Sequence, residues 1–237
     1  MQIRALFALL LVCLPSVVVA QEPTAPPPET DRQIHLGGYI QYDFLMRLDD
    51  DTDAATFRFR RVRLQGSGNL TDKIGWAASI EVTSTPVLRD AFVTLKHIPG
   101  ATLRVGQLVM PYGMEQYVFS SNTLEFTERA TTDVIASRDA GIVVSNDRRF
   151  FGWFSNAPAV TNGTRQNVAD NNNDKDGMVR LTATPGRLPG FSLGVNGMRG
   201  AQPDGMRTRV GADVSYARRL RRIAAELDTE QTGEGSE

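Results

Sequence analysis

Apolar and polar residues alternate along much of the chain beyond residue 33. In the stretch 33–47, for example, Ile40 and Phe44 fall on one face and Asp43 falls on the other. A period of two predicts β-strands, and several of these stretches are long for strands of a soluble protein. We therefore expect an all-β protein of antiparallel strands, at 33–47, 56–70, 73–84, 87–98, 101–108, 139–146, 149–156, 177–184, 190–198 and 206–217.

The connections between the expected strands alternate in length. The turns at Asn69 to Asp72 and at Pro99-Gly100 are short, whereas most of the intervening connections are long: 48–55, 109–138, 157–176 and 199–205. Transmembrane barrels join their strands in this way, with short periplasmic turns and long outer loops. The strands of a soluble β-sandwich show the same alternation of apolar and polar residues. A sandwich, however, gives no reason for short and long connections to alternate along the chain. We expect an antiparallel transmembrane β-barrel, and a secreted β-sandwich binding module is the alternative.

The stretch 220–230 fits two patterns. Leu220, Ile223 and Leu227 match one face of a helix, but Ile223, Ala225 and Leu227 also alternate as in a strand. Continuity with the preceding hairpin favours an eleventh strand. The acidic end of the chain, from Thr229 to Glu237, is not strand-like.

The first twenty residues predict a secretory signal peptide. Arg4 precedes an apolar run, and small residues up to Ala20 suit cleavage after that position. Residues 21–32 contain four prolines and predict an extended linker, so the barrel would occupy 33–237. The single cysteine, Cys13, lies in the expected signal peptide, which leaves the exported protein without a disulfide.

Positive and negative charges nearly balance, with 26 Lys+Arg against 27 Asp+Glu. This balance argues against a nucleic-acid partner, which would require a basic surplus. Only three of the basic residues are lysines, at positions 73, 96 and 175, so arginine supplies nearly all of the positive charge.

A series of short motifs resembles one known family. The segments 57–64 and 88–93 belong to the series, and its most specific members are Val105 to Gln107, Pro111 to Glu115 and Phe126 to Arg129. In this order and at this spacing they resemble the phosphate-selective porin O and P family.

The resemblance implies an outer-membrane channel of sixteen strands, usually a homotrimer, that passes small anions and contacts outer-membrane lipid. Its location would be the outer membrane of a Gram-negative bacterium, reached by export through the periplasm. Ten or eleven strands are fewer than sixteen, and the final amphipathic strand with a terminal aromatic that is usual in the family is absent. We therefore expect a C-terminally truncated, open partial barrel. Alone it would be a non-functional fragment, because unpaired backbone groups are costly in lipid.

Arginine side chains are the candidates for an anion path, because guanidinium groups suit oxyanions and line anion pores. If Val62 and Leu64 face lipid, Arg61 and Arg63 face the lumen. Arg58 and Arg60 would then face lipid, unless a bulge near residue 60 shifts the phase or both lie beyond the hydrocarbon band. The candidate path is Arg58, Arg60, Arg61, Arg63, Arg104, Arg129, Arg138, Arg207 and Arg209.

The alternative is that these arginines form no anion path and are ordinary lumen charges balanced by Asp43, Glu81 and Asp213. The family's phosphate-selective members add lumen lysines, and no such ring can be placed here. The sequence therefore predicts a general anion preference and leaves phosphate selectivity open.

We expect the long segment 109–138 to fold into the lumen and narrow it. Its aromatic residues, among them Tyr112 and Tyr117, would be costly on a free loop, and Pro111 and Gly113 suit a fixed turn at its entry. A surface flap is the alternative.

Enzyme activity, a cofactor and a metal are not expected. Only His35 and His97 could serve as a histidine base for a nucleophile. The acidic loops 48–55 and 170–177 resemble the start of a calcium loop, but Ala183 stands where the second would need a bidentate glutamate. We expect solvated outer loops, with calcium binding left open.

Overall fold

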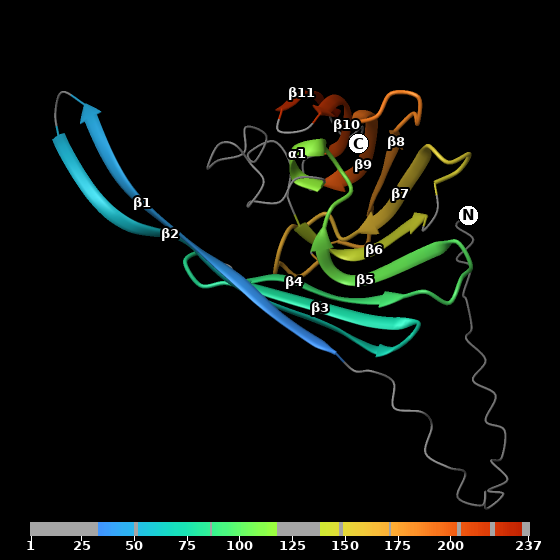
Figure 1. The fold of residues 1–237 in the computed structure, drawn as a ribbon, viewed down its shortest axis with the longest axis horizontal. Helices are drawn as coiled ribbons and strands as arrows, with labels where there is room; N and C mark the ends of the chain where they lie inside the picture. Colours follow the sequence, from blue (N-terminus) through green and yellow to red (C-terminus); the bar gives the residue numbers. More distant parts are fainter. Residues whose placement is uncertain are drawn as a thin grey trace, which may run out of the picture. The chain divides into compact units, whose positions relative to one another are not determined.

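One antiparallel sheet forms the body of the protein (Figure 1). The computed structural model describes residues 33–49, 52–85, 87–117, 138–146, 149–170, 172–202, 205–218 and 221–233. Within them, each of the eleven strands lies beside its neighbours in sequence. The strands are β1 (Ile34–Asp49), β2 (Thr52–Thr71), β3 (Ile74–Glu81), β4 (Leu88–Leu95), β5 (Ala101–Val109), β6 (Arg138–Asn146), β7 (Phe154–Thr161), β8 (Asp176–Ala183), β9 (Phe191–Gln202), β10 (Gly205–Arg218) and β11 (Arg221–Gly233), with a short helix α1 (Met114–Tyr117) after β5.

This topology confirms the expected all-β, antiparallel architecture, including the eleventh strand. A β-sandwich requires two packed sheets, so the sandwich alternative is wrong. Among the described residues, β1 pairs only with β2 and β11 pairs only with β10. The sheet is therefore open at both edges, as expected for a partial barrel wall.

The described residues contain no helix that is long and apolar enough to cross a membrane.

The two faces of the sheet differ in polarity. On what we call the outer face, the strands expose large apolar side chains. On the first hairpin the rings of Tyr42 and Phe57 stack with their centroids 5.9 Å apart, and Tyr42 meets Phe59 edge-on at 5.0 Å. The opposite side, which we call the inner face, carries ion-paired side chains such as Arg63, Glu81 and Arg180. This segregation fits a wall with lipid on one side and water on the other. Examples of exposed outer-face residues are Ile40, Phe44, Leu64, Val160, Val195 and Val210.

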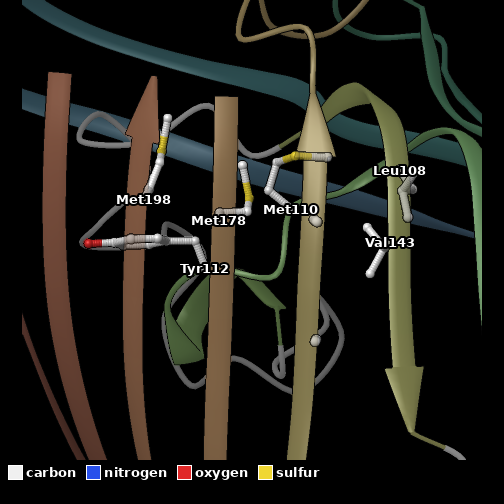
Figure 2. Packing of buried hydrophobic residues seen from close by; sticks show 8 residues of the cluster. Leu108, Met110, Tyr112, Val143, Met178 and Met198 are labelled. Carbon is white, nitrogen blue, oxygen red and sulfur yellow. The ribbon is translucent and has the colours of Figure 1, made fainter. Parts of the chain in front are cut away.

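Part of the inner face is covered by residues 110–117, which follow β5 and which we call the strap. Met110 and Tyr112 of the strap cluster with Val143 of β6, Met178 of β8 and Met198 of β9 (Figure 2). All five side chains are buried. The strap removes these apolar side chains from water, which stabilises an apolar patch on the inner face.

The seventh strand lies later in the sequence than the alternation predicted. The expected strand was 149–156, but β7 begins at Phe154. Phe151 and Gly152 instead form a turn in which both have positive φ, 54° and 77°. Positive φ is rare for a bulky residue such as phenylalanine, so alternation alone could not reveal this turn.

Two of the expected long loops are strands. β1 and β2 continue into 48–55, and β9 and β10 continue into 199–205. β11 likewise extends to Gly233, which lies opposite Met206, although its acidic sequence is not strand-like. Each of these predictions is wrong for the same reason. Backbone hydrogen bonds between neighbouring strands continue as long as a partner strand is present, and they do not depend on which side chains the strands carry.

Several expectations concern residues outside the described ones. They are the signal peptide 1–20, the linker 21–32, Arg129, and residues 118–137 of the long loop. These stay predictions.

Candidate functional site

A β-bulge brings the arginines of β2 to the inner face. Gln41 of β1 lies opposite Arg61, but the next residue of β1, Tyr42, lies opposite Phe59. Arg60 is therefore an extra residue in β2, and the alternation of faces shifts there. Of the two explanations that the sequence left open for Arg58 and Arg60, the bulge near residue 60 is confirmed.

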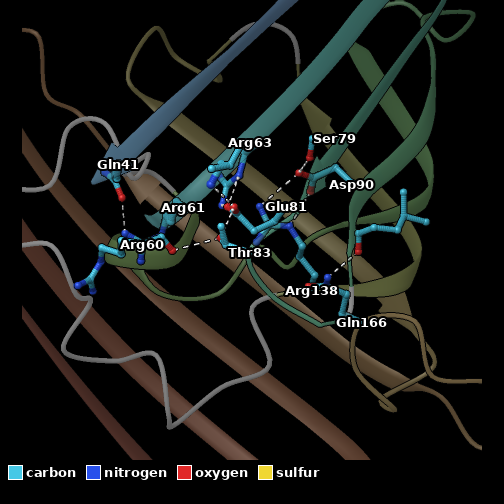
Figure 3. A network of polar contacts seen from close by, with 12 residues as sticks. Gln41, Arg60, Arg61, Arg63, Ser79, Glu81, Thr83, Asp90, Arg138 and Gln166 are labelled. Atoms are coloured by element: carbon cyan, nitrogen blue, oxygen red, sulfur yellow. Dashed lines mark hydrogen bonds and ion pairs between the residues drawn. The ribbon is translucent and has the colours of Figure 1, made fainter. Parts of the chain in front are cut away.

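Ion pairs show that these arginines share the inner face. Arg58 and Arg60 both contact Asp43 Oδ2, at 3.2 and 3.3 Å. Arg63 lies 3.1 Å from Glu81 on β3. The remaining arginine of the strand, Arg61, donates to the Gln41 amide oxygen at 2.7 Å (Figure 3).

A second bulge occurs in β4. Ser79 lies opposite Asp90, whereas Ile80 lies opposite Leu88, so Arg89 is an extra residue. Asp90 accepts a hydrogen bond from Ser79 on one side. On the other side it forms an ion pair with Arg138 of β6 at 2.8 Å (Figure 3).

We call six of these residues the arginine cluster: Arg58, Arg60, Arg61, Arg63, Arg89 and Arg138. Among the described residues, the carboxylates that contact or face them are Asp43, Glu81 and Asp90. A recess of about 370 Å³ opens into the cluster. Its basic lining comes from Arg58, Arg60, Arg61 and Arg89, and Glu81 is its acidic residue. This surface offers several positively charged, planar donors, which suit an oxyanion.

A second, larger recess lies on the inner face beside the β2–β3 and β4–β5 turns. It measures about 610 Å³, and Gly75 and Ala77 of β3 leave it hollow because their side chains are small. Arg104 reaches this recess rather than the arginine cluster. Its charged or titratable lining residues are His35, Asp72, Lys73, Lys96 and Arg104. Two of the three lysines of the chain therefore stand beside a predicted anion-path residue.

The strap is fastened to the inner face by side chains of distant strands. The Gly113 N–H donates to Asn196 Oδ1 on β9 at 3.2 Å, and the Met114 N–H donates to Glu226 Oε1 on β11 at 3.0 Å. Gly113 has φ +69°, and a Cβ there would lie 2.4 Å from Glu226 Oε1. For residues 110–117, the expectation of a folded-in segment is therefore confirmed, and the surface flap is wrong.

Tyr112 of the strap is 1% exposed, and its hydroxyl lies with the Asp228 carboxylate over Gly211. Burial raises the pKa of Tyr112, and the negative charge of Asp228 adds to that shift. The hydroxyl therefore stays protonated and neutral, so the strap places no charge at this point of the inner face.

Beneath and beside the strap, two arginines are each paired with a carboxylate. Arg180 donates to both carboxylate oxygens of Asp213, at 2.7 and 2.9 Å, and both side chains are almost fully buried. Arg207 lies 3.1 Å from Asp176, and Arg209 is 7% exposed. Arg207 and Arg209 thus face inward, as predicted, but they lie apart from the arginine cluster.

The acidic loop before β8 does not gather its carboxylates. The Asp174 N–H donates to Asn172 Oδ1, while Asp176 turns toward Arg207. In the part of the chain that the structure describes, no three His, Cys, Asp or Glu side chains come together to hold a metal. Side chains 48–54 of the other acidic loop lie outside the described ones.

A family model described as phosphate-selective porin O and P matches residues 34–226, which span β1 to β10 and part of β11. The chain belongs to this porin family. The resemblance read from the motifs is confirmed, and membership indicates a channel rather than an enzyme.

Comparison with solved structures gives a similar chain in OmpT (in-vitro folded), an outer membrane protein of Vibrio cholerae in its trimer form. The two share 11% sequence identity, and the match covers 84% of this porin and 78% of that chain, with a TM-score of 0.39. The sequence of this porin matches none of the curated proteins with which it was compared.

Sequence reasoning missed two kinds of residue in this porin. Asn196 and Glu226 fasten the strap across the sheet, and no local pattern reveals such contacts. Arg89 could have been found. In strict alternation Leu88 and Asp90 would share a face, and that mismatch of an apolar residue with a charged one signals a bulge.

Proposed function

We propose that this protein is an outer-membrane porin whose pore prefers small anions. The observation that carries the proposal is the bulge at Arg60, because it supports one continuous cationic surface from four arginines of β2. Together with Arg89 and Arg138 they lie near three carboxylates of the described residues, Asp43, Glu81 and Asp90. An anion that sheds water in a pore needs such donors in return, and rings of arginine supply them.

The path that we propose runs along the inner face of β1 to β6. It begins at the arginine cluster and continues to the recess that holds Lys73, Lys96 and Arg104. The family is named for phosphate selectivity, and we include inorganic phosphate among the anions that the path would accept. Arg129, in the segment that continues the strap, remains a proposed member. Arg207 and Arg209 would contribute less, because Arg207 is neutralised by Asp176 and Arg209 is buried.

Location and assembly follow from the same proposal. The exposed apolar outer face would contact lipid, after export through the periplasm to the outer membrane of a Gram-negative bacterium. Unpaired strand edges cost several kcal/mol per backbone group in lipid, so the conducting form must provide partners for β1 and β11. A homotrimer is the proposed assembly.

The test is the reversal potential of the assembled protein, extracted from outer membranes and placed in a planar bilayer with a KCl gradient. Replacing Arg61 and Arg63 together with glutamine should lower the chloride-to-potassium permeability ratio by roughly tenfold or more, since each unit charge about 4 Å from the ion is worth ~1 kcal/mol in water, a factor of about five. The matched control is the Arg149→Gln/Arg187→Gln pair, which removes the same charge from two exposed positions in turns. An equal shift in both proteins, or none in either, would contradict the proposal.

A further inference from the structure

The bulge residue Arg89 stands apart from the other arginines of its cluster. Its neighbours are each held by a carboxylate or an amide, with Arg63 on Glu81 and Arg138 on Asp90. In the described residues, Arg89 forms no ion pair, and its Nε is buried without a hydrogen-bond partner. Its guanidinium group nevertheless lines the recess of about 370 Å³. Arg89 thus brings to the recess a cation that no carboxylate of the described residues pairs with.

The backbone that carries Arg89 is fixed by a loop from another part of the sheet. The carbonyl of Leu88 accepts hydrogen bonds from Gln107 Nε2 at 3.1 Å, Gln166 Nε2 at 2.5 Å and Asn167 Nδ2 at 2.7 Å. Gln107 also donates to the carbonyl of Arg89 at 2.9 Å. Figure 3 shows Gln166 reaching this strand beside Arg138. The β7–β8 loop therefore holds the bulge from outside the arginine cluster.

This loop is itself held in an unusual conformation. Arg165 and Asn167 have positive φ values of 78° and 57°, which cost energy in residues other than glycine. Asn167 is kept in place by its N–H, which donates to Gln107 Oε1 at 2.8 Å. Gln107 thus bonds both to the loop and to the bulge, so the loop conformation and the position of Arg89 are linked through one side chain.

We propose that Arg89 is a specificity-determining residue of the anion path, and that Gln166 and Asn167 of the β7–β8 loop are positioning residues that hold it there. The inference rests on the proposed function. It adds that an arginine which a β-bulge places on the inner face contributes to the preference for anions. It also adds that the β7–β8 loop fixes the position of that arginine.

The first measurement compares Arg89→Gln with Arg187→Gln, which removes the same charge from an exposed position in the β8–β9 turn. Arg89→Gln should lower the chloride-to-potassium permeability ratio about fivefold, whereas the control should leave it unchanged. If Arg61→Gln/Arg63→Gln shifts the ratio but Arg89→Gln does not, the inference is overturned and the proposed function stands. If neither shifts it, both fall.

A second variant guards against misfolding. Arg89→Cys in a folded, conducting pore can be modified from the lumen, because the only other cysteine is Cys13 in the expected signal peptide. A positively charged methanethiosulfonate should restore the ratio within one recording, and a negatively charged one should lower it further. Opposite reagents that produce the same result would overturn the proposal.

The positioning role is tested by combining variants. Gln166→Ala/Asn167→Gly keeps the positive φ accessible at residue 167 and removes both amide donors. The pair should lower the ratio when Arg89 is present and should have no further effect in Arg89→Gln. An equal effect in both backgrounds would mean that the loop acts on the pore by another route.

Discussion

The inner face of this porin uses arginine in two different ways. Within the described residues, the guanidinium groups of β2, β4 and β6 outnumber the carboxylates that contact them, several are partly exposed, and a recess opens among them. On β8 and β10, Arg180 and Arg207 each have a carboxylate of their own, and the strap covers this side of the sheet. The difference shows that an ion path cannot be identified from the residue type and the face of the sheet alone. Whether an arginine can meet an ion also depends on how many carboxylates contact it and on whether the strap covers it.

The largest effect that we expect is on stability, in the covered half. Asp213→Asn leaves the buried Arg180 with a neutral partner, and breaking a buried pair in this way costs about 3–5 kcal/mol. Asp43→Asn is the matched control in the open half, where Asp43 contacts both Arg58 and Arg60, its side chain is 26% exposed, and such a pair is worth about 1 kcal/mol or less. Urea unfolding in detergent micelles measures both. Equal losses would remove the distinction between the two halves.

A smaller loss is expected where the strap meets the sheet. Gly113→Ala would place a Cβ against Glu226 Oε1 and would also strain a residue with positive φ, which alone costs roughly 1–2 kcal/mol. The strap should detach, with a higher single-channel conductance and a lower melting temperature. Gly100→Ala has a comparable φ of +81° but no atom within 4 Å of the new Cβ. It should therefore lose stability without a change in conductance; if conductance rises there too, the strap contact is not the cause.

The smallest effect should follow from removing a whole ion pair in the covered half. Arg207→Gln/Asp176→Asn leaves the net charge unchanged, so the reversal potential in a KCl gradient should stay where it is. The comparison is with Arg61→Gln/Arg63→Gln, which lowers the positive charge of the open half. A shift toward cations in the first variant would place Arg207 on the ion path, as the sequence alone predicted.

Periodicity alone determined much of the fold. Alternation at 33–47 and 206–217 predicted long antiparallel strands with one apolar face, because side chains of a strand point alternately to its two sides. The family resemblance followed from the order of short motifs between these stretches. The same alternation placed Arg61, Arg63, Arg207 and Arg209 on the inner face, where the structure has them.

Tertiary structure decided which of these arginines could meet an anion. The bulges at Arg60 and Arg89 depend on how two strands pair, and an extra residue in one strand has no fixed signature in the local sequence. The strap lies where it does because Asn196 and Glu226, far along the chain, accept its N–H groups. Alternation assigns each side chain to one face of the sheet. The carboxylates around an arginine and the strap that covers it come from segments distant in sequence, and only the tertiary structure brings these segments together.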